Sequence, residues 1–290
     1  MMPIARNRNS RTKRRFPLTA VKTVIVALGA CLVVLTGCLS GITPQISLQY
    51  MYVWMLGVTS DKARANAMLT NAVSCLSFGT AVLAHPLLGL KGGAFRPVSH
   101  PPGVLVLFIG STVGAILVSG VARSITSMNV RRSFQFVGVC AGIYILMDAN
   151  HFVASPHLQL SYVLLLALSL VSGALTQVTG LASGTVLVLL LYAVGRQPIV
   201  ECIVESIMVI GLASVLPAIS CWRKGLCDAR YSLAGAIGGV VAATSMLAIL
   251  PGLKERTLLL CFAFMTMFHA AREISKIVVS LPANSRVDLD

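Results

Sequence analysis

The chain has 290 residues, of which 56% are apolar and only 11% are charged, and its net charge at pH 7 is +14. A soluble domain carries about 25% charged residues, so this chain has too few charges to coat a water-exposed surface. Its mean hydropathy of +0.86 leads to the same conclusion. The composition excludes a soluble enzyme, a disordered chain and a disulfide-rich secreted domain, and it indicates a membrane protein that crosses the bilayer several times.

The positive charge is not arranged as a surface for nucleic acid. Seven of the 23 lysines and arginines lie within residues 1–22, and the others stand singly or in pairs between apolar segments. Aromatic residues do not alternate with them, as they would on a nucleic-acid-binding face. Most of the eight cysteines lie inside apolar segments, where cysteine packs as a small hydrophobic residue. We therefore expect no nucleic-acid partner, no metal and no cofactor.

The first apolar segment, at 19–42, follows the basic stretch and is longer than the about 7–15 apolar residues of a secretory signal. It is predicted to be a crossing helix whose amino terminus lies in the cytoplasm. Further apolar segments are predicted at 45–57, 66–84, 103–122, 133–149, 158–179, 181–195, 199–221, 231–251 and 257–271. Two of these, 45–57 and 181–195, are shorter than the roughly 20 residues that cross a bilayer, so each is either a short tilted helix or a re-entrant half-helix.

The distribution of bases favours ten crossings, because Lys and Arg concentrate on the cytoplasmic side of a membrane. With ten crossings, 18 bases lie inside and five outside. Two re-entrant segments would reduce this difference to 15 inside and eight outside. We therefore expect ten crossings, with eight crossings and two half-helices as the alternative. Both arrangements place the amino and carboxyl termini in the cytoplasm.

An internal repeat becomes visible when the chain is compared with itself at an offset of 139 residues. Gly41 then stands opposite Gly180, and Asn66 stands opposite Glu205. Further along, GSTVGA at 110–115 is similar to GGVVAA at 238–243. Five crossings in each half would place the second copy upside down, because an odd number of crossings reverses the direction of the chain.

The predicted fold is therefore an all-α polytopic membrane protein with two inverted repeats of about five helices, and with short broken helices near the midplane. Inverted repeats with interrupted helices are typical of secondary transporters. The alternative is a duplication in which the glycines serve only helix packing. The predicted divisions are a basic cytoplasmic tail at 1–18, a first repeat at 19–149, an outer linker at 150–157, a second repeat at 158–275 and a cytoplasmic tail at 276–290.

The order of these features resembles the TauE/SafE-type sulfite exporter family. ARANAML at 63–69 and GLASGTVLVLLLYAVGRQP at 180–198 carry the resemblance, which extends over about residues 24–275. The family's glycine triplet followed by proline is replaced by GITPQ at 41–45 and by GLASGT at 180–185. The resemblance implies passage of small sulfur-containing anions, such as sulfite or organosulfonates, across a membrane.

An anion that enters the membrane must exchange water for other donors. No Lys or Arg is predicted deep within a crossing, so backbone amides at helix starts, where the helix dipole is positive, are the expected donors. Glycines allow close approach, and hydroxyl and amide side chains add donors. The candidate substrate-binding residues are Gly37, Gly41, Thr43, Gln45, Asn66, Gly180, Ser183, Gly184, Thr185 and Ser206. The alternative is that these glycines only allow helices to pack closely.

Glu205 is the candidate for proton coupling. In a helix that starts near Pro198 it lies about 10 Å from the helix start, and an ionisable residue inside the membrane indicates function. Ionised, it would repel an anion, whereas its protonated form would permit passage. The alternative is that Glu205 reaches water at the interface, together with Glu201 one turn earlier.

The sequence thus predicts a secondary transporter for a small anion that works by alternating access. The alternative function is a structural or accessory membrane subunit without transport activity. We do not expect an enzyme, because the sequence offers no nucleophile paired with a base. The expected partners are the small anion and the lipid bilayer, and a homo-oligomer is left open.

Overall fold

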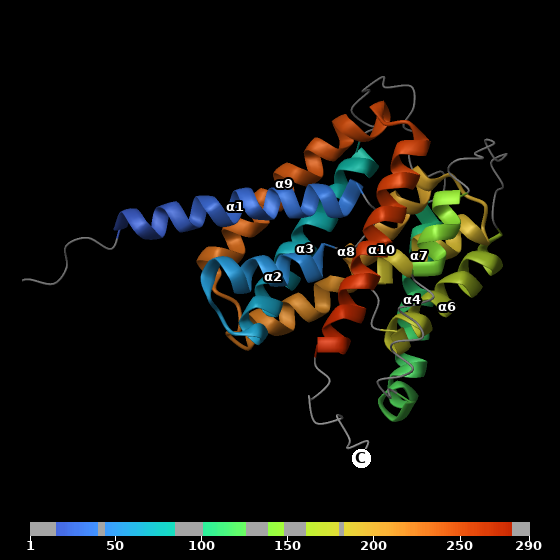
Figure 1. The fold of residues 1–290 in the computed structure, drawn as a ribbon, viewed down its shortest axis with the longest axis horizontal. Coiled ribbons are helices and arrows are strands. Elements are labelled where there is room, and N and C mark those ends of the chain that lie inside the picture. Colours follow the sequence, from blue (N-terminus) through green and yellow to red (C-terminus); the bar gives the residue numbers. More distant parts are fainter. Residues whose placement is uncertain are drawn as a thin grey trace, which may run out of the picture.

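A computed structural model describes residues 16–39, 44–84, 101–125, 139–147, 161–179 and 183–279. Within these ranges the chain is helical and contains no strand (Figure 1). The principal helices are α1 (Phe16–Leu39), α2 (Gln45–Leu56), α3 (Ser60–Ala84), α4 (Pro101–Ile125), α6 (Tyr162–Thr179), α7 (Ser183–Ala193), α8 (Ile199–Arg223), α9 (Ala229–Ile249), the short 3-10 helix η1 (Leu250–Gly252) and α10 (Glu255–Val279). Residues 139–147 are also helical. The predicted all-α fold is thereby confirmed.

Four of the described helices are long and apolar enough to cross a membrane. They are Ala20–Leu39 in α1, Ser60–Ala84, Ile199–Arg223 and Ala229–Ile249. The 25 residues of α3 or α8 span about 37 Å, which exceeds the roughly 30 Å hydrocarbon core. The chain is therefore a membrane protein.

The two predicted short segments are short helices. Segment 45–57 is α2, with 12 residues, and segment 181–195 is α7, with 11 residues. Segment 66–84 begins earlier than predicted, at Ser60, because the helix includes the charged residues of its first turns. The predicted tail 1–18 apart from its last three residues, the linker 150–157 and the last residues of the tail 276–290 lie outside the described residues.

Helices α3 and α8 form an antiparallel pair at the centre of the bundle. Asn71 Nδ2 donates to Ser214 Oγ at 3.1 Å. Gly211 faces Cys75, and Met208 faces Gly79. Positions that advance along α3 therefore face positions that recede along α8, so the two helices run in opposite directions and cross near their midpoints.

The other helices pair in a pattern that is unchanged when the two halves of the chain are exchanged. Helix α1 packs against α9 as α6 packs against α4, and these are the two most extensive interfaces. Likewise α2 packs on α3 as α7 packs on α8, and α1 contacts α2 as α6 contacts α7. Figure 1 shows α1, α3 and α9 side by side.

Glycines set the closest of these interfaces. A Cβ at Gly110 would meet the side chain of Ser169 on α6, and one at Gly114 would meet the carbonyl oxygen of Leu170. On the other pair, a Cβ at Gly238 of α9 would meet the carbonyl oxygen of Ala27 on α1. Backbones approach this closely only where side chains are absent, as is common between membrane helices.

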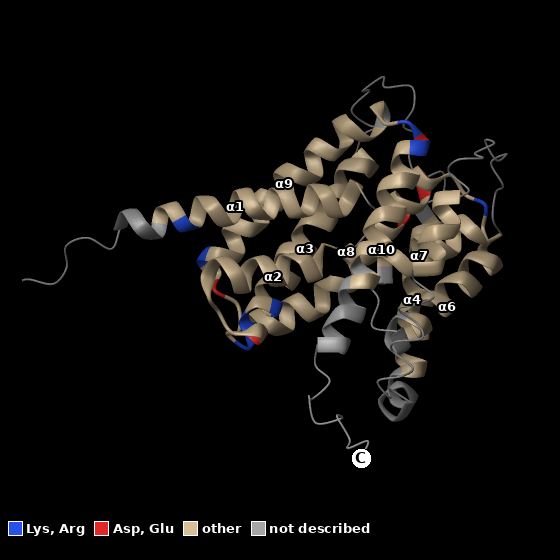
Figure 2. Cartoon of the chain, in the orientation of Figure 1, with Lys and Arg blue, Asp and Glu red and all other residues tan. Residues whose placement is uncertain are grey.

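Charged residues gather at two opposite ends of the described bundle (Figure 2). We call these the Asn66 end, where α3 and α9 start and α8 ends, and the Glu205 end, where α7 ends and α8 and α10 start. The Asn66 end carries the bases Lys22, Lys62, Arg64, Arg223, Lys224 and Arg230 and the acids Asp61 and Asp228. The Glu205 end carries the bases Arg196, Lys254 and Arg256 and the acids Glu201, Glu205 and Glu255. The Asn66 end is therefore the more positive of the two.

Candidate substrate site

The two short helices start inside the membrane layer. Helix α2 ends at Leu56, beside the charged start of α3, and α7 ends at Ala193, just before Arg196. Helices of 12 and 11 residues are about 18 and 16 Å long, little more than half of the hydrocarbon core. Their starts, at Gln45 and Ser183, therefore lie at depth rather than at either surface.

The candidate residues near these starts are placed in part. Gly37 is buried in the last turn of α1, and Gln45, the first residue of α2, is half-buried. In the first turn of α7, Gly184 is buried and Thr185 is 4% exposed. Gly41, Thr43 and Gly180 lie outside the described residues, and of Ser183 only the backbone, at the start of α7, is described.

Asn66 is fully buried and joins α3 to α9. Its side-chain oxygen accepts hydrogen bonds from the backbone N–H of Asp228 at 2.8 Å and from Ser232 Oγ at 2.7 Å. Its side-chain nitrogen, Nδ2, is buried without a hydrogen-bond partner. A buried amide donor is normally satisfied, so Asn66 has an N–H group available for an oxygen of a bound molecule.

A line of polar side chains continues from Asn66 along α3. Thr70 Oγ1 and Tyr52 Oη are 2.7 Å apart, and the Tyr52 hydroxyl is 3.3 Å from the carbonyl oxygen of Tyr231. One turn further, Ser74 Oγ donates to the carbonyl oxygen of Thr70. The sequence analysis did not identify Tyr52, Thr70 or Ser74. The spacing of Asn66, Thr70 and Ser74 by four residues could have indicated them, because such residues share one helix face.

A second set of buried polar atoms lies at the start of α8. Glu205 is 8% exposed, and one of its carboxylate oxygens, Oε2, is buried without a partner. Ser206 Oγ and Gln197 Oε1 are also buried and unpartnered. The first residue of α8 is satisfied, since the N–H of Ile199 donates to Glu255 Oε1 of α10 at 3.1 Å. Three unpartnered polar groups within ten residues mark this stretch as chemically unusual for a membrane interior.

The structure does not bring Asn66 and Glu205 together. From the contact between Asn71 and Ser214, Asn66 lies five residues toward one end of the bundle and Glu205 lies nine residues toward the other. At 1.5 Å per residue these two sites are separated by about 20 Å along the helices. They are equivalent positions in the repeat, but they lie in opposite halves of the bundle.

The turn between α8 and α9 contains Cys227, which lies outside the spanning helices. Burial raises the pKa of its thiol, and the neighbouring Cys221 adds to the shift. In the part of the chain that the structure describes, no three His, Cys, Asp or Glu residues lie close enough to hold a metal ion.

Comparisons with protein-family models, with curated proteins and with solved structures found no match. The functional interpretation therefore depends on the geometry and the sequence of this chain.

Proposed function

We propose that this protein is a secondary transporter for a small anion, built from two inverted repeats as in the TauE/SafE-type sulfite exporters that its sequence resembles. The antiparallel crossing of α3 and α8 is the observation that carries the proposal. These helices occupy residues 60–84 and 199–223, so the offset of 139 residues relates both their first and their last residues. Two equivalent membrane helices that run in opposite directions are what an inverted repeat requires.

The neighbouring helices support the same arrangement. Gly238 of α9 approaches Ala27 of α1, and Gly110 of α4 approaches Leu166 of α6. Positions 27 and 166 differ by 139, and 110 and 238 are the first residues of the two aligned glycine motifs. Equivalent helices thus meet through equivalent residues.

Ten crossings are favoured over eight by the contact between Asn66 and Asp228. If 45–57 and 181–195 re-entered, the turn before α3 and the turn before α9 would lie on opposite sides of the membrane. The hydrogen bond of 2.8 Å between Asn66 Oδ1 and the N–H of Asp228 requires both turns at the same end. Helix α2 would then carry the chain back across the bilayer despite its 12 residues.

The expected substrate is sulfite, an organosulfonate or a related small sulfur-containing anion, as the resemblance implies. The supporting features are the membrane-embedded starts of α2 and α7, which present backbone N–H groups, and the unpartnered donor of Asn66. Because Asn66 and Glu205 lie in opposite halves, each would meet the anion in a different access state. Glu205 would couple the passage to protons, since its protonation removes a charge that repels the anion.

Transport by purified full-length protein in proteoliposomes tests the proposal. We expect uptake of radiolabelled sulfite or taurine that is absent from protein-free vesicles and that changes with an imposed pH gradient. Asn66→Ala should reduce this uptake at least tenfold, whereas Ser245→Ala, on the exposed face of α9, should leave it unchanged. Absence of uptake for sulfite, taurine and sulfate alike would overturn the proposal and favour an accessory membrane subunit.

A further inference from the structure

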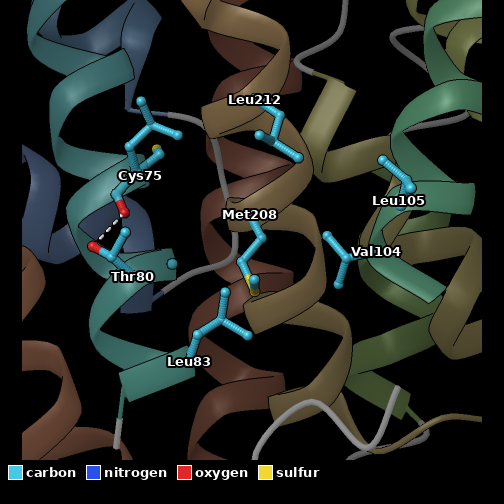
Figure 3. Close-up of a pocket in the computed structure, with 9 residues that line it drawn as sticks. Cys75, Thr80, Leu83, Val104, Leu105, Met208 and Leu212 are labelled. Atoms are coloured by element: carbon cyan, nitrogen blue, oxygen red, sulfur yellow. Dashed lines mark hydrogen bonds between the residues drawn. The ribbon is translucent and has the colours of Figure 1, made fainter. Parts of the chain in front are cut away.

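A cavity of about 270 Å³ lies between α3, α4 and α8. It is lined by Cys75, Leu76, Gly79, Thr80, Leu83, Val104, Leu105, Met208 and Leu212. Figure 3 shows Met208 between α3 and α4, with Val104 and Leu105 facing it from α4. The cavity is separate from the buried polar groups of Asn66 and Glu205, since neither of them lines it.

The walls offer nothing to a polar ligand. Only Cys75 and Thr80 carry polar side-chain atoms, and both are already satisfied. The Cys75 thiol donates to Asn71 Oδ1 at 3.6 Å, and the Thr80 hydroxyl donates to the carbonyl oxygen of Leu76 at 2.9 Å. Ordered water needs several polar partners, so an apolar occupant is the one that fits these walls.

The mouth of the cavity faces the surroundings of the bundle. Leu83, Leu105 and Leu212 are 44%, 55% and 37% exposed, and they come from the three helices that form the cavity. Because α3 and α8 are long enough to span a bilayer, the medium outside this mouth is lipid. No Lys, Arg, Asp or Glu lines the cavity.

The length of the cavity suits one leaflet. Along α3 its lining runs from Cys75 to Leu83, which is about 12 Å of helix, and Leu83 is next to the last residue of that helix. One leaflet contributes roughly 15 Å of hydrocarbon. The cavity therefore reaches from near the membrane surface at the Glu205 end almost to the midplane.

The equivalent position in the other half of the bundle is filled by direct contact. There Gly235 and Gly239 of α9 lie against the hydroxyls of Tyr52, Thr70 and Ser74. In the aligned motifs, 235 and 239 correspond to Leu107 and Ser111 of α4, whose larger side chains replace the two glycines. Helix α4 accordingly has a smaller interface with α8 than α9 has with α3, and the cavity occupies the difference.

We infer that this cavity is a binding site for one acyl chain of a membrane phospholipid from the leaflet at the Glu205 end. The chain enters between Leu83, Leu105 and Leu212 and lies against Gly79 and Met208. It fills the space that α9 fills directly on the other side, and so completes the packing of α4 against α8. This site depends on the membrane location of α3 and α8 and not on the proposed transport activity.

Photochemical labelling in vesicles tests the inference. The full chain is reconstituted into phosphatidylcholine vesicles that contain a phosphatidylcholine with a diazirine midway along one acyl chain, irradiated and digested. We expect labelling of the peptides around Gly79 and Met208. Leu212→Trp, which fills the mouth, should reduce this labelling several-fold. Leu216→Trp is the matched control, because Leu216 lies one turn further on α8, is 76% exposed and does not line the cavity.

Two further measurements keep the inference falsifiable if Leu212→Trp fails to fold. Leu105→Trp fills the same mouth from α4 and should have the same effect on labelling. The unaltered chain, exchanged repeatedly into detergent, should retain bound phospholipid by native mass spectrometry. Labelling that persists in the filled variants, or complete loss of phospholipid on detergent exchange, would show only ordinary lipid contact and would overturn the inference.

Discussion

Gly57 and Arg196 lie 139 residues apart and share the left-handed backbone conformation, with φ of 62° and 54°. Each closes the short helix before it in the same way. The N–H of Gly57 donates to the carbonyl oxygen of Val53, and the N–H of Arg196 donates to that of Tyr192, at 2.9 and 3.2 Å. The turn after α2 and the turn after α7 are therefore the same structure, although one carries glycine and the other arginine.

This relationship predicts opposite effects of substitution on stability. A left-handed conformation costs a residue with a Cβ about 1–2 kcal/mol, while glycine adds about 0.5–1 kcal/mol of backbone entropy to the unfolded chain. Arg196→Gly should raise the free energy of unfolding by about 0.5–1 kcal/mol, and Gly57→Ala should lower it by about 1 kcal/mol. A Cβ at Gly57 meets no atom within 4 Å, so the loss is conformational. Unfolding by denaturant in detergent measures both.

Gly252→Ala is the matched control for these variants. Its Cβ would also meet no atom within 4 Å, but its φ is not positive. An alanine there should leave stability unchanged or raise it slightly. Equal destabilisation by Gly57→Ala and Gly252→Ala would contradict the conformational explanation.

The interface between α4 and α6 predicts a much larger effect of a single methyl group. In Gly114→Ala the new Cβ meets the carbonyl oxygen of Leu170, a backbone atom that cannot move aside without shifting α6. Overpacking of this kind costs about 1–3 kcal/mol. Gly79→Ala, whose Cβ would lie 3.3 Å from Met208 Cγ, should cost much less because a methionine side chain adapts. Thermal unfolding of the two variants in the same detergent gives the comparison, and equal losses would contradict it.

The hydrogen bonds of Asn66 predict a graded response. Ser232→Ala removes one donor and should lower stability by about 0.6 kcal/mol, the typical value for a hydrogen bond between membrane helices. Asn66→Ala should cost about 1–3 kcal/mol, because it leaves the N–H of Asp228 without its acceptor. Thr244→Ala is the control on α9, since its hydroxyl is exposed and donates only within its own helix. A loss for Asn66→Ala no larger than that of the control would remove Asn66 as a link between α3 and α9.

The contact between the starts of α3 and α9 predicts which residues share a side of the membrane. Ser60→Cys and the native Cys227 should react with a membrane-impermeant maleimide from one side, and Lys254→Cys should react from the other. A thiolate is the reacting form. Because burial raises the pKa of Cys227, its thiolate fraction at neutral pH is smaller than that of a free thiol. Its labelling should therefore be slow at pH 7 and rise about tenfold per pH unit until its pKa is reached.

Cys227→Ser identifies the signal of this residue against the other cysteines. If Ser60→Cys reacted from the same side as Lys254→Cys, the ten-crossing arrangement would be wrong. Labelling of Cys227 that did not change between pH 7 and pH 9 would contradict the raised pKa of its thiol.

The helices could be predicted from the sequence because their apolar segments are long and uninterrupted. Segment 199–221 begins at the residue where α8 begins, and segment 45–57 coincides with α2 within one residue. The start of α3 was predicted six residues late. Its first turns contain Asp61, Lys62 and Arg64, which lower the local hydropathy although a helix end at the membrane surface accommodates charge.

The partners of the polar residues could not be predicted in the same way. Asn66 stands opposite Glu205 in the repeat, which suggested a common axis, but its bonds are to Asp228 and Ser232 in α9. These contacts join residues more than 160 positions apart, and a pattern along one helix carries no information about them. The position of Glu205 inside the membrane followed from helix rise alone, whereas its unpartnered oxygen depends on the helices packed around α8.

Glu205→Gln separates proton coupling from simple permeation. Wild-type flux of sulfite in proteoliposomes should rise as the pH on the side of the Glu205 end falls, because protonation of Glu205 removes the charge that repels the anion. Glutamine keeps the size and remains neutral, so Glu205→Gln should retain flux and lose most of this pH dependence. Glu201→Gln is the matched control one turn earlier on α8, where the side chain is only partly buried, and it should keep the wild-type profile. The sulfite–bisulfite equilibrium also shifts with pH, so the same profile is measured with taurine, whose sulfonate stays ionised. If Glu205→Gln kept the wild-type profile with both substrates, Glu205 would be a buried structural residue and another group would carry the proton.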